Sequence, residues 1–138
     1  MPFTYYTDNS LITLLFNNTP FTALANVYLA LSTTTPTQTK GSAPYWNFTE
    51  PVGNGYARVT MACTTAVFPA PTTGSTYNNT SVSFPQATGS QGTVTYLGFF
   101  DAVSNGNLIG YAAMNTPQTI VSGNVLTFAI NQLTLSNN

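Results

Sequence analysis

Histidine is absent from this chain, and charged residues are nearly absent: two basic and three acidic residues make up 4% of the 138 residues. An average soluble protein carries roughly 25% charged residues. Without histidine, the chain cannot form histidine-based catalytic triads or histidine metal sites. Lys40 and Arg58 are the basic residues, so there is no basic patch and we expect no nucleic-acid partner.

Acidic side chains are too few and too scattered for common active sites. They belong to Asp8, Glu50 and Asp101. A glycosidase needs two carboxylates that face each other across a cleft, and nothing around Glu50 and Asp101 indicates such a pair. Calcium binding needs clustered oxygen ligands, and the sequence has no acidic cluster. We therefore predict a protein that is not an enzyme and uses no metal or cofactor.

Cysteine occurs once, at Cys63, so the chain has no internal disulfide and its fold depends on packing. Alternation places Cys63 on the apolar face of a strand, where a buried, unreactive thiol is expected. Residues 1–3 lack the basic start of a signal peptide, and the longest apolar run, 11–16, is too short to span a bilayer. We expect cytoplasmic synthesis without an export signal and no membrane partner.

The surface must instead be built from uncharged polar residues, mainly Thr, Asn, Ser, Gln and Gly. With a net charge of −1, copies of the chain repel one another little, and nearly neutral surfaces tend to associate. The 43% apolar content predicts a folded core rather than disorder. The composition favours a chain that packs against others in an assembly. The alternative is an extracellular protein that presents its Thr- and Asn-rich face to water or sugars.

The N-terminal part of the chain predicts an arm followed by a helix. Residues 1–8 are expected to form an extended arm. A short helix over 8–18 follows, capped by Thr7 or Asp8. Its apolar side chains favour a helix that plugs one end or one face of a β structure. A helix that binds a partner is the other possibility.

From residue 26 the apolar residues recur with a period of two, which predicts β-strands. Strands are predicted over 26–32, 53–64, 81–84, 93–103, 108–114, 117–121 and 125–130. The Asn105-Gly106 pair is typical of a hairpin turn. A switch in the parity of the apolar residues predicts a bulge or break at Asn131-Gln132.

Short strands separated by turn signals predict one all-β domain over 1–138. We expect an antiparallel β-sandwich over 26–135, jelly-roll-like, with one short N-terminal helix.

The stretch 53–63 is a glycine-rich turn that opens into an alternating strand. Gly53 and Gly55 allow positive φ angles or a close backbone approach. The strand carries Arg58, and Glu50 lies just before the turn as the nearest acidic partner. For Arg58, the sequence leaves open a turn-locking ion pair, an ordinary exposed strand position, and a catalytic or ligand-binding role.

Aromatic residues gather in the arm and in two long loops, 33–54 and 69–80. Loops of this length are usually functional or ordered by a partner. Exposed aromatic clusters mark interfaces, but rings that fold back over the end of the sandwich are an equal possibility. The candidate interface residues are Phe3, Tyr5, Tyr6, Tyr45, Trp46, Phe48 and Tyr77.

Short motifs follow one another in a particular order after the expected helix. They are Tyr-Leu-Ala-Leu-Ser-Thr (28–33), Glu50, Gly-Tyr-Ala-Arg (55–58), Ser-Val-Ser-Phe-Pro-Gln-Ala-Thr (81–88), Gly-Thr-Val-Thr-Tyr-Leu-Gly-Phe-Phe-Asp-Ala (92–102) and Ser-Gly-Asn-Val-Leu-Thr-Phe (122–128). This order resembles a family of small tailed-bacteriophage virion proteins, labelled head decoration (cement) or tail-fibre-like proteins. The resemblance covers most of the chain and implies no catalytic residues. It implies a structural role in which Glu50, Tyr56 and Arg58 hold the turn.

Composition and resemblance together predict a capsid decoration protein. Such a subunit forms a homo-oligomer, with a trimer as one form, and binds the outer face of the major capsid protein lattice on the virion surface. The alternative is a receptor-binding module of a tail fibre or tailspike that recognises a host surface glycan through Tyr45, Trp46 and Tyr77. A third option, a small glycan-processing enzyme, would depend on Glu50 or Asp101.

Overall fold

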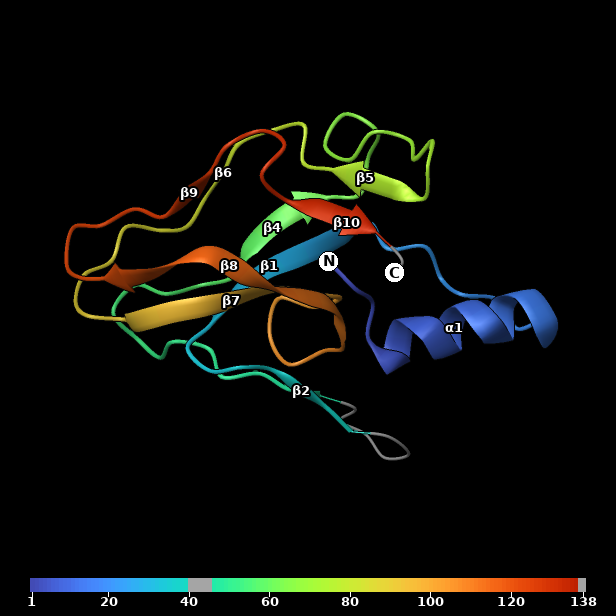
Figure 1. Ribbon diagram of the computed structural model, residues 1–138, viewed down its shortest axis with the longest axis horizontal. Coiled ribbons are helices and arrows are strands. Elements are labelled where there is room, and N and C mark those ends of the chain that lie inside the picture. Colours follow the sequence, from blue (N-terminus) through green and yellow to red (C-terminus); the bar gives the residue numbers. More distant parts are fainter. Residues whose placement is uncertain (40–45, 137–138) are drawn as a thin grey trace.

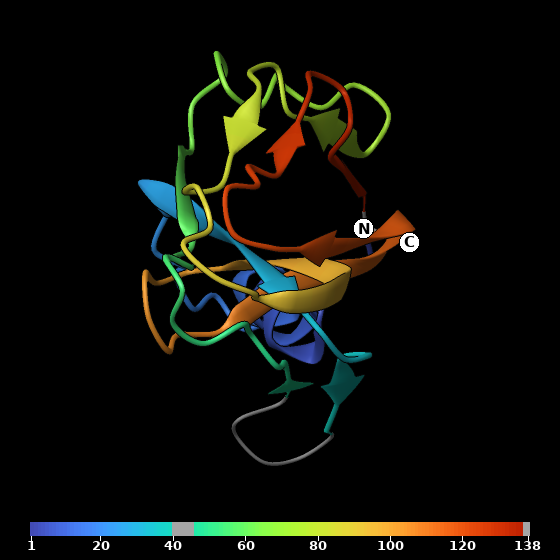
Figure 2. The ribbon, with the colours of Figure 1, turned by 90° about the vertical axis from the view of Figure 1, so that its left-hand side faces the viewer.

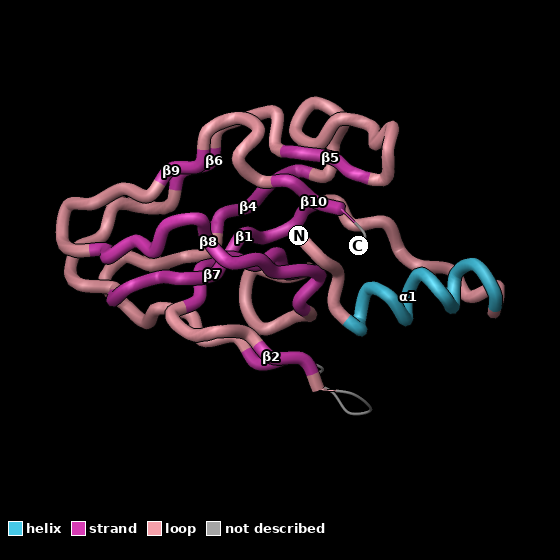
Figure 3. Tube along the Cα trace, viewed as in Figure 1, coloured by secondary structure: helices cyan, strands magenta, loops and turns pink. Residues whose placement is uncertain are grey.

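The computed structural model describes residues 1–39 and 46–136. Within them the chain is mostly antiparallel β structure with one short helix, as predicted (Figures 1 and 3). The elements are α1 (Tyr5–Phe16), β1 (Asn26–Ser32), β2 (Thr37–Gln38), β3 (Trp46–Asn47), β4 (Val59–Ala62), β5 (Ser75–Tyr77), β6 (Val82–Ser83), β7 (Gly92–Phe100), β8 (Leu108–Ile120), β9 (Thr127–Phe128) and β10 (Thr134–Ser136).

A four-stranded sheet in the order β4-β1-β7-β8 forms the centre of the fold. The remaining strands pair into two-stranded ribbons, β5–β10, β6–β9 and β2–β3. Figure 2 shows the first two ribbons on one side of the sheet and β2–β3 on the other. This layering is consistent with a sandwich, and the jelly-roll detail stays a prediction.

The face of the sheet toward the first two ribbons holds the main core. Leu29 pairs with Phe99 and Leu31 with Leu97 across β1 and β7, and all four side chains are buried. Alternation in both strands sends these residues to the same face. The ribbons and their loops cover them with a further set of buried side chains: Val82, Phe84, Ala87, Phe128 and Leu133.

The opposite face carries a smaller core of Ala30, Phe100 and Leu108. Partly buried aromatic rings pack against it, including Trp46 and Phe48 from the β2–β3 side. Both central strands are therefore covered on both faces, which explains why 93–103 is apolar on both of its faces in its second half.

The β7–β8 hairpin forms at the predicted Asn-Gly turn. Asn105 and Gly106 have φ angles of 52° and 72°, the positive values that a type I′ turn requires. β8 then continues through Pro117 as a single strand, so the prediction of two strands is wrong. β8 is the last strand of the sheet, and an edge strand tolerates proline because one of its sides needs no amide donor. Extra residues bulge from β8 between the pairs Tyr96–Ala113 and Val94–Gln118.

Two further predictions need correction. α1 begins at Tyr5 rather than at residue 8, with Thr4 at the N-cap position, so residues 1–8 are not an extended arm. Cys63 is exposed rather than buried, because β4 ends at Ala62 and the chain leaves the sheet there.

Candidate functional site

Glu50, Tyr56 and Arg58 converge beside β4. Arg58 Nε donates to both carboxylate oxygens of Glu50, at 3.0 and 3.1 Å. The Tyr56 hydroxyl donates to Glu50 Oε2 at 2.7 Å. The ion pair that the sequence left open is therefore present, and its role in holding the turn stays a prediction.

Arg58 also reaches the β7–β8 hairpin. Its Nη1 donates to the carbonyl oxygens of Ala102 and Asn105, at 2.8 and 2.9 Å. Its guanidinium carbon lies 3.6 Å from the centroid of the Phe100 ring, in cation–π geometry. The Arg58 side chain is only 6% exposed, so the alternative of an ordinary exposed strand residue is wrong.

Tyr56 connects this network to the central sheet. Its hydroxyl accepts the backbone N–H of Leu31 at 3.0 Å, and its ring stacks on Phe84 with the centroids 6.2 Å apart. Burial, together with the neighbouring Glu50 carboxylate, raises the pKa of the Tyr56 phenol above its ordinary value. The phenol therefore stays protonated and can donate to Glu50 while it accepts from Leu31.

The two glycines of the turn have different constraints. Gly53 and Gly55 have φ angles of 72° and 81°, where L-residues are strained. A Cβ at Gly55 would also lie 2.9 Å from the Gln86 carbonyl oxygen, whereas at Gly53 it would meet no atom within 4 Å. Gly55 is thus required by both conformation and space.

This network is suited to holding structure. Both Glu50 oxygens and all three guanidinium nitrogens of Arg58 have partners within the chain. The described residues contain no group of three His, Cys, Asp or Glu side chains that could hold a metal ion.

The predicted interface aromatics are mostly engaged within the chain. Trp46 and Phe48 contact the Phe100 ring edge-on, with centroid distances of 5.1 and 5.2 Å, so they fold back over the core. Tyr6 donates to Asp101 Oδ2 at 3.2 Å, and Phe3 forms a β-bridge with Gly110.

The other members of the predicted set differ in exposure. Tyr5 is partly buried, whereas Tyr77 is 41% exposed. Tyr45 lies outside the described residues. Of the predicted interface residues that the structure describes, only Tyr77 is exposed.

α1 contains no buried residue, so the prediction that it plugs the β structure is wrong. Leu15 and Phe16 are 64% and 80% exposed. We call the following set the α1 apolar surface: Leu11, Ile12, Leu14, Leu15 and Phe16.

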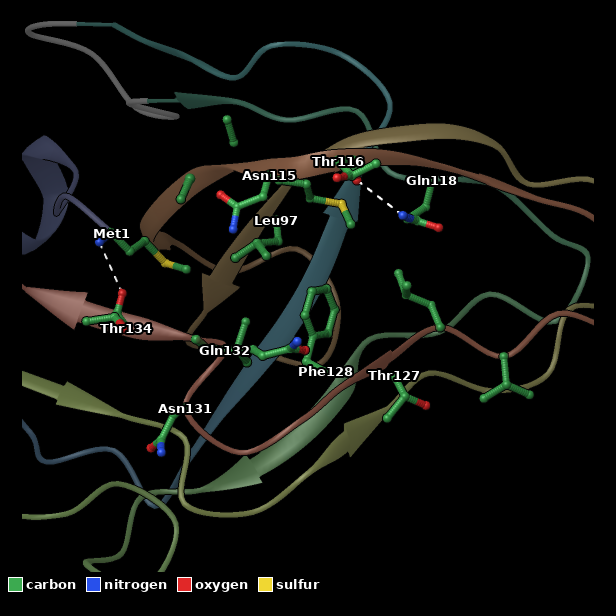
Figure 4. Close-up of a pocket in the computed structure, with 16 residues that line it drawn as sticks. Met1, Leu97, Asn115, Thr116, Gln118, Thr127, Phe128, Asn131, Gln132 and Thr134 are labelled. Atoms are coloured by element: carbon green, nitrogen blue, oxygen red, sulfur yellow. Dashed lines mark hydrogen bonds between the residues drawn. The ribbon is translucent and has the colours of Figure 1, made fainter.

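A groove of about 870 Å³ lies between β8 and the segment 125–134, and we call it the β8–β10 groove. Figure 4 shows side chains from β8 along one side and from 125–134 along the other, with Leu97 and Phe128 between them. Sequence reasoning missed this groove. Two features of the sequence could have indicated it: the Asn-Thr-Pro interruption at 115–117 and the parity switch at Asn131-Gln132. The structure confirms the predicted break at Asn131-Gln132 as a turn, with Asn131 at a φ angle of 67°.

These features define a small, mostly β domain with one exposed apolar helix. The chain belongs to the family described as podophage GP4 fiber I protein gp80, whose family model matches residues 2–136. It is thus a phage virion protein, which confirms the coarser part of the resemblance. No curated protein matches the chain. Across residues 1–39 and 46–136, no helix is long and apolar enough to cross a membrane.

Proposed function

We propose that the chain is a fibre subunit of a podophage tail, fixed in place by apolar contacts with neighbouring chains. The α1 apolar surface carries this proposal. Full burial of a Leu, Ile or Phe side chain contributes about 1.5–3 kcal/mol, and the described part of the chain leaves five such side chains of α1 exposed. A free monomer gains nothing from that exposure, whereas an assembled subunit gains binding energy.

The family description supports the fibre function. Recognition of a host surface glycan belongs to this proposal, with the exposed ring of Tyr77 as a candidate contact. Trp46 is a weaker candidate because it covers Phe100.

The second candidate is the capsid decoration protein, which would bind the major capsid protein and copies of itself. Its support is the composition: with 4% charged residues, the chain can form a large contact surface that excludes ion pairs. Both candidates locate the chain in the virion after synthesis in the host cytoplasm.

We ascribe no catalytic activity to Glu50 or Asp101. Glu50 accepts hydrogen bonds from Arg58 and Tyr56. Asp101 accepts from the backbone N–H and the side-chain amide of Asn107, at 2.6 and 2.8 Å. Loss of a measured glycan hydrolysis in a Glu50→Gln variant would contradict this view.

Copy number in purified particles separates the two candidates. We expect quantitative mass spectrometry to find a small number of copies relative to the major capsid protein, and immunogold electron microscopy to label the tail. Labelling spread over the head, with a copy number near that of the capsid protein, would instead establish decoration. Absence from the particles would overturn both.

A further inference from the structure

We propose that α1 of one copy docks into the β8–β10 groove of a second copy, in a head-to-tail contact. This inference rests on the proposed function, because it names the neighbour that covers the α1 apolar surface. The evidence comes from the shape of the apolar surface, the lining of the groove and the scarcity of charge on both.

The shape of the α1 apolar surface suits a groove rather than a flat face. At 3.6 residues per turn, its five side chains span an arc of about 200° around the helix axis. The remaining arc carries Asn9, Ser10 and Thr13. A flat partner could cover only part of so wide an arc, whereas two groove walls can cover most of it.

The first turn of α1 is fixed to the sheet, so the rest of the helix is presented to a neighbour. The backbone N–H of Thr4 and the hydroxyl of Thr7 both donate to the carbonyl oxygen of Ile109, at 2.9 and 2.8 Å. Beyond this anchor, α1 extends away from the sheet, as Figure 1 shows. Each copy therefore holds its helix outside its own body.

The groove has an apolar floor and a polar rim, the arrangement found at protein interfaces. Buried Leu97, Phe128 and Leu133 form part of its floor. Exposed Asn115 and Thr116 lie on its β8 side, and their side chains make no hydrogen bond within the described residues. They are free to meet the polar arc of a docked helix.

The size of the groove and the charges of the two parts suit such a contact. The groove has a volume of about 870 Å³, which is large enough for several apolar side chains of α1. No charged side chain lines the groove, and the only charged side chain of α1 is Asp8 in its first turn.

A second copy is the occupant that this chain itself supplies. Every copy carries both the α1 apolar surface and the β8–β10 groove, on which the Met1 ammonium donates to the Thr134 carbonyl oxygen. Such heterologous contacts generate rings or open chains of subunits. Either product suits a fibre subunit.

Cysteine cross-linking tests the contact directly. In a Cys63→Ser background, purified Leu15→Cys protein is mixed with Asn115→Cys protein and oxidised, with a short bismaleimide as a second cross-linker. We expect mixed dimers that contain one chain of each variant. The matched control uses Val52→Cys protein in place of Asn115→Cys protein. Val52 is 91% exposed but does not line the groove, so we expect no mixed dimer with Leu15→Cys protein.

Other occupants give different products. Cross-linked dimers of Leu15→Cys alone, more abundant than the mixed dimers, would mean that helices pair with one another and would overturn the proposal. The chain that carries both Leu15→Cys and Asn115→Cys provides a second check. If its disulfide forms only within monomers, α1 occupies the groove of its own chain, and the proposal is overturned.

Sedimentation of the purified chain gives an independent measure. We expect Ala113→Arg in the groove and Leu15→Ser in the helix each to raise the dissociation constant of self-association at least about tenfold. The double variant should be little worse than either single one, because both remove one contact. A wild-type chain that is monomeric at all concentrations, yet present in particles, would overturn this proposal and leave the proposed function standing.

Discussion

The surroundings of Arg58 and the second half of α1 both depart from the usual pattern, in which charged side chains are exposed and large apolar side chains are buried. Arg58 carries a full charge but is nearly buried, with a hydrogen-bond or cation–π partner for each part of its guanidinium. The α1 apolar surface, by contrast, is exposed. Arg58 and Glu50 are thus paired within the fold, and we propose that the α1 apolar surface contacts neighbouring chains.

This difference separates stability from association. Substitutions around Arg58 should lower the free energy of unfolding of the domain, because removing one partner leaves a poorly solvated charge. Substitutions in α1 should leave the domain folded and remove its contacts.

The largest effect is expected for Arg58→Met. The variant leaves the Glu50 carboxylate with fewer donors and two hairpin carbonyls without Arg58, so the free energy of unfolding should fall by about 3 kcal/mol. Urea denaturation measures it. Thr60→Ala, at an exposed position of β4 two residues after Arg58, is the control and should cost at most about 0.5 kcal/mol. Equal losses for both variants would contradict a structural role for the ion pair.

Gly55→Ala should cost about 2 kcal/mol, because it adds both φ strain and a clash with the Gln86 carbonyl. Gly53→Ala has similar φ strain and open space, and should cost about 1 kcal/mol. Thermal or urea unfolding of the two variants provides the comparison. A Gly53 variant that is the less stable of the two would show that space around Gly55 does not matter.

Tyr56→Phe should cost about 1–2 kcal/mol at neutral pH, because Leu31 N–H loses its acceptor and Glu50 a donor. The raised pKa of Tyr56 means that the folded state retains a proton that the unfolded state loses above about pH 10. Wild-type stability should therefore be independent of this group below pH 9 and fall as the pH rises above 10. In the Tyr56→Phe variant, the free energy of unfolding should fall less steeply above about pH 10 than in the wild type. An equal fall in both proteins would show that other groups cause it.

Leu15→Ser with Phe16→Ser should change the free energy of unfolding by no more than about 0.5 kcal/mol, since exposed side chains contribute little to stability. Urea denaturation at a low protein concentration, where self-association is weak, gives the relevant value. A loss above about 2 kcal/mol would show that α1 packs against its own domain in solution.

The smallest effect is expected from salt. The chain has five charged side chains, and two of them, Arg58 and Glu50, pair with each other. Little charge is therefore left for salt to screen at an interface. Washing purified particles with 1 M sodium chloride should release none of this protein, as judged by immunoblotting of the supernatant. Release at moderate salt with retention at low salt would show that ion pairs hold it.

Local signals predicted the elements that short-range geometry determines. The alternation over 26–32 gave the right bounds for β1, and Asn105-Gly106 gave the right turn. The proximity of Glu50 and Arg58 across a short turn also made their ion pair foreseeable. In each case the interacting residues are close in sequence or follow a fixed period.

Predictions failed where the outcome depends on what lies beside an element. An apolar helix looks the same in sequence whether its own sheet or another chain covers it, so the exposure of α1 could not be read from residues 5–16. Pro117 predicts a break between two strands, because nothing local in the sequence shows that β8 is an edge strand. Cys63 followed the alternation of its strand, but the strand ends one residue earlier.

The most direct test of the central claim is incorporation of the Leu15→Ser, Phe16→Ser chain into phage particles that lack the wild-type copy. Asn9→Ser, on the polar arc of the same helix, is the control. If α1 provides the assembly contact, the folded double variant should be depleted at least about tenfold in purified particles, while Asn9→Ser is present at wild-type level. Incorporation of the double variant at wild-type level would contradict the account.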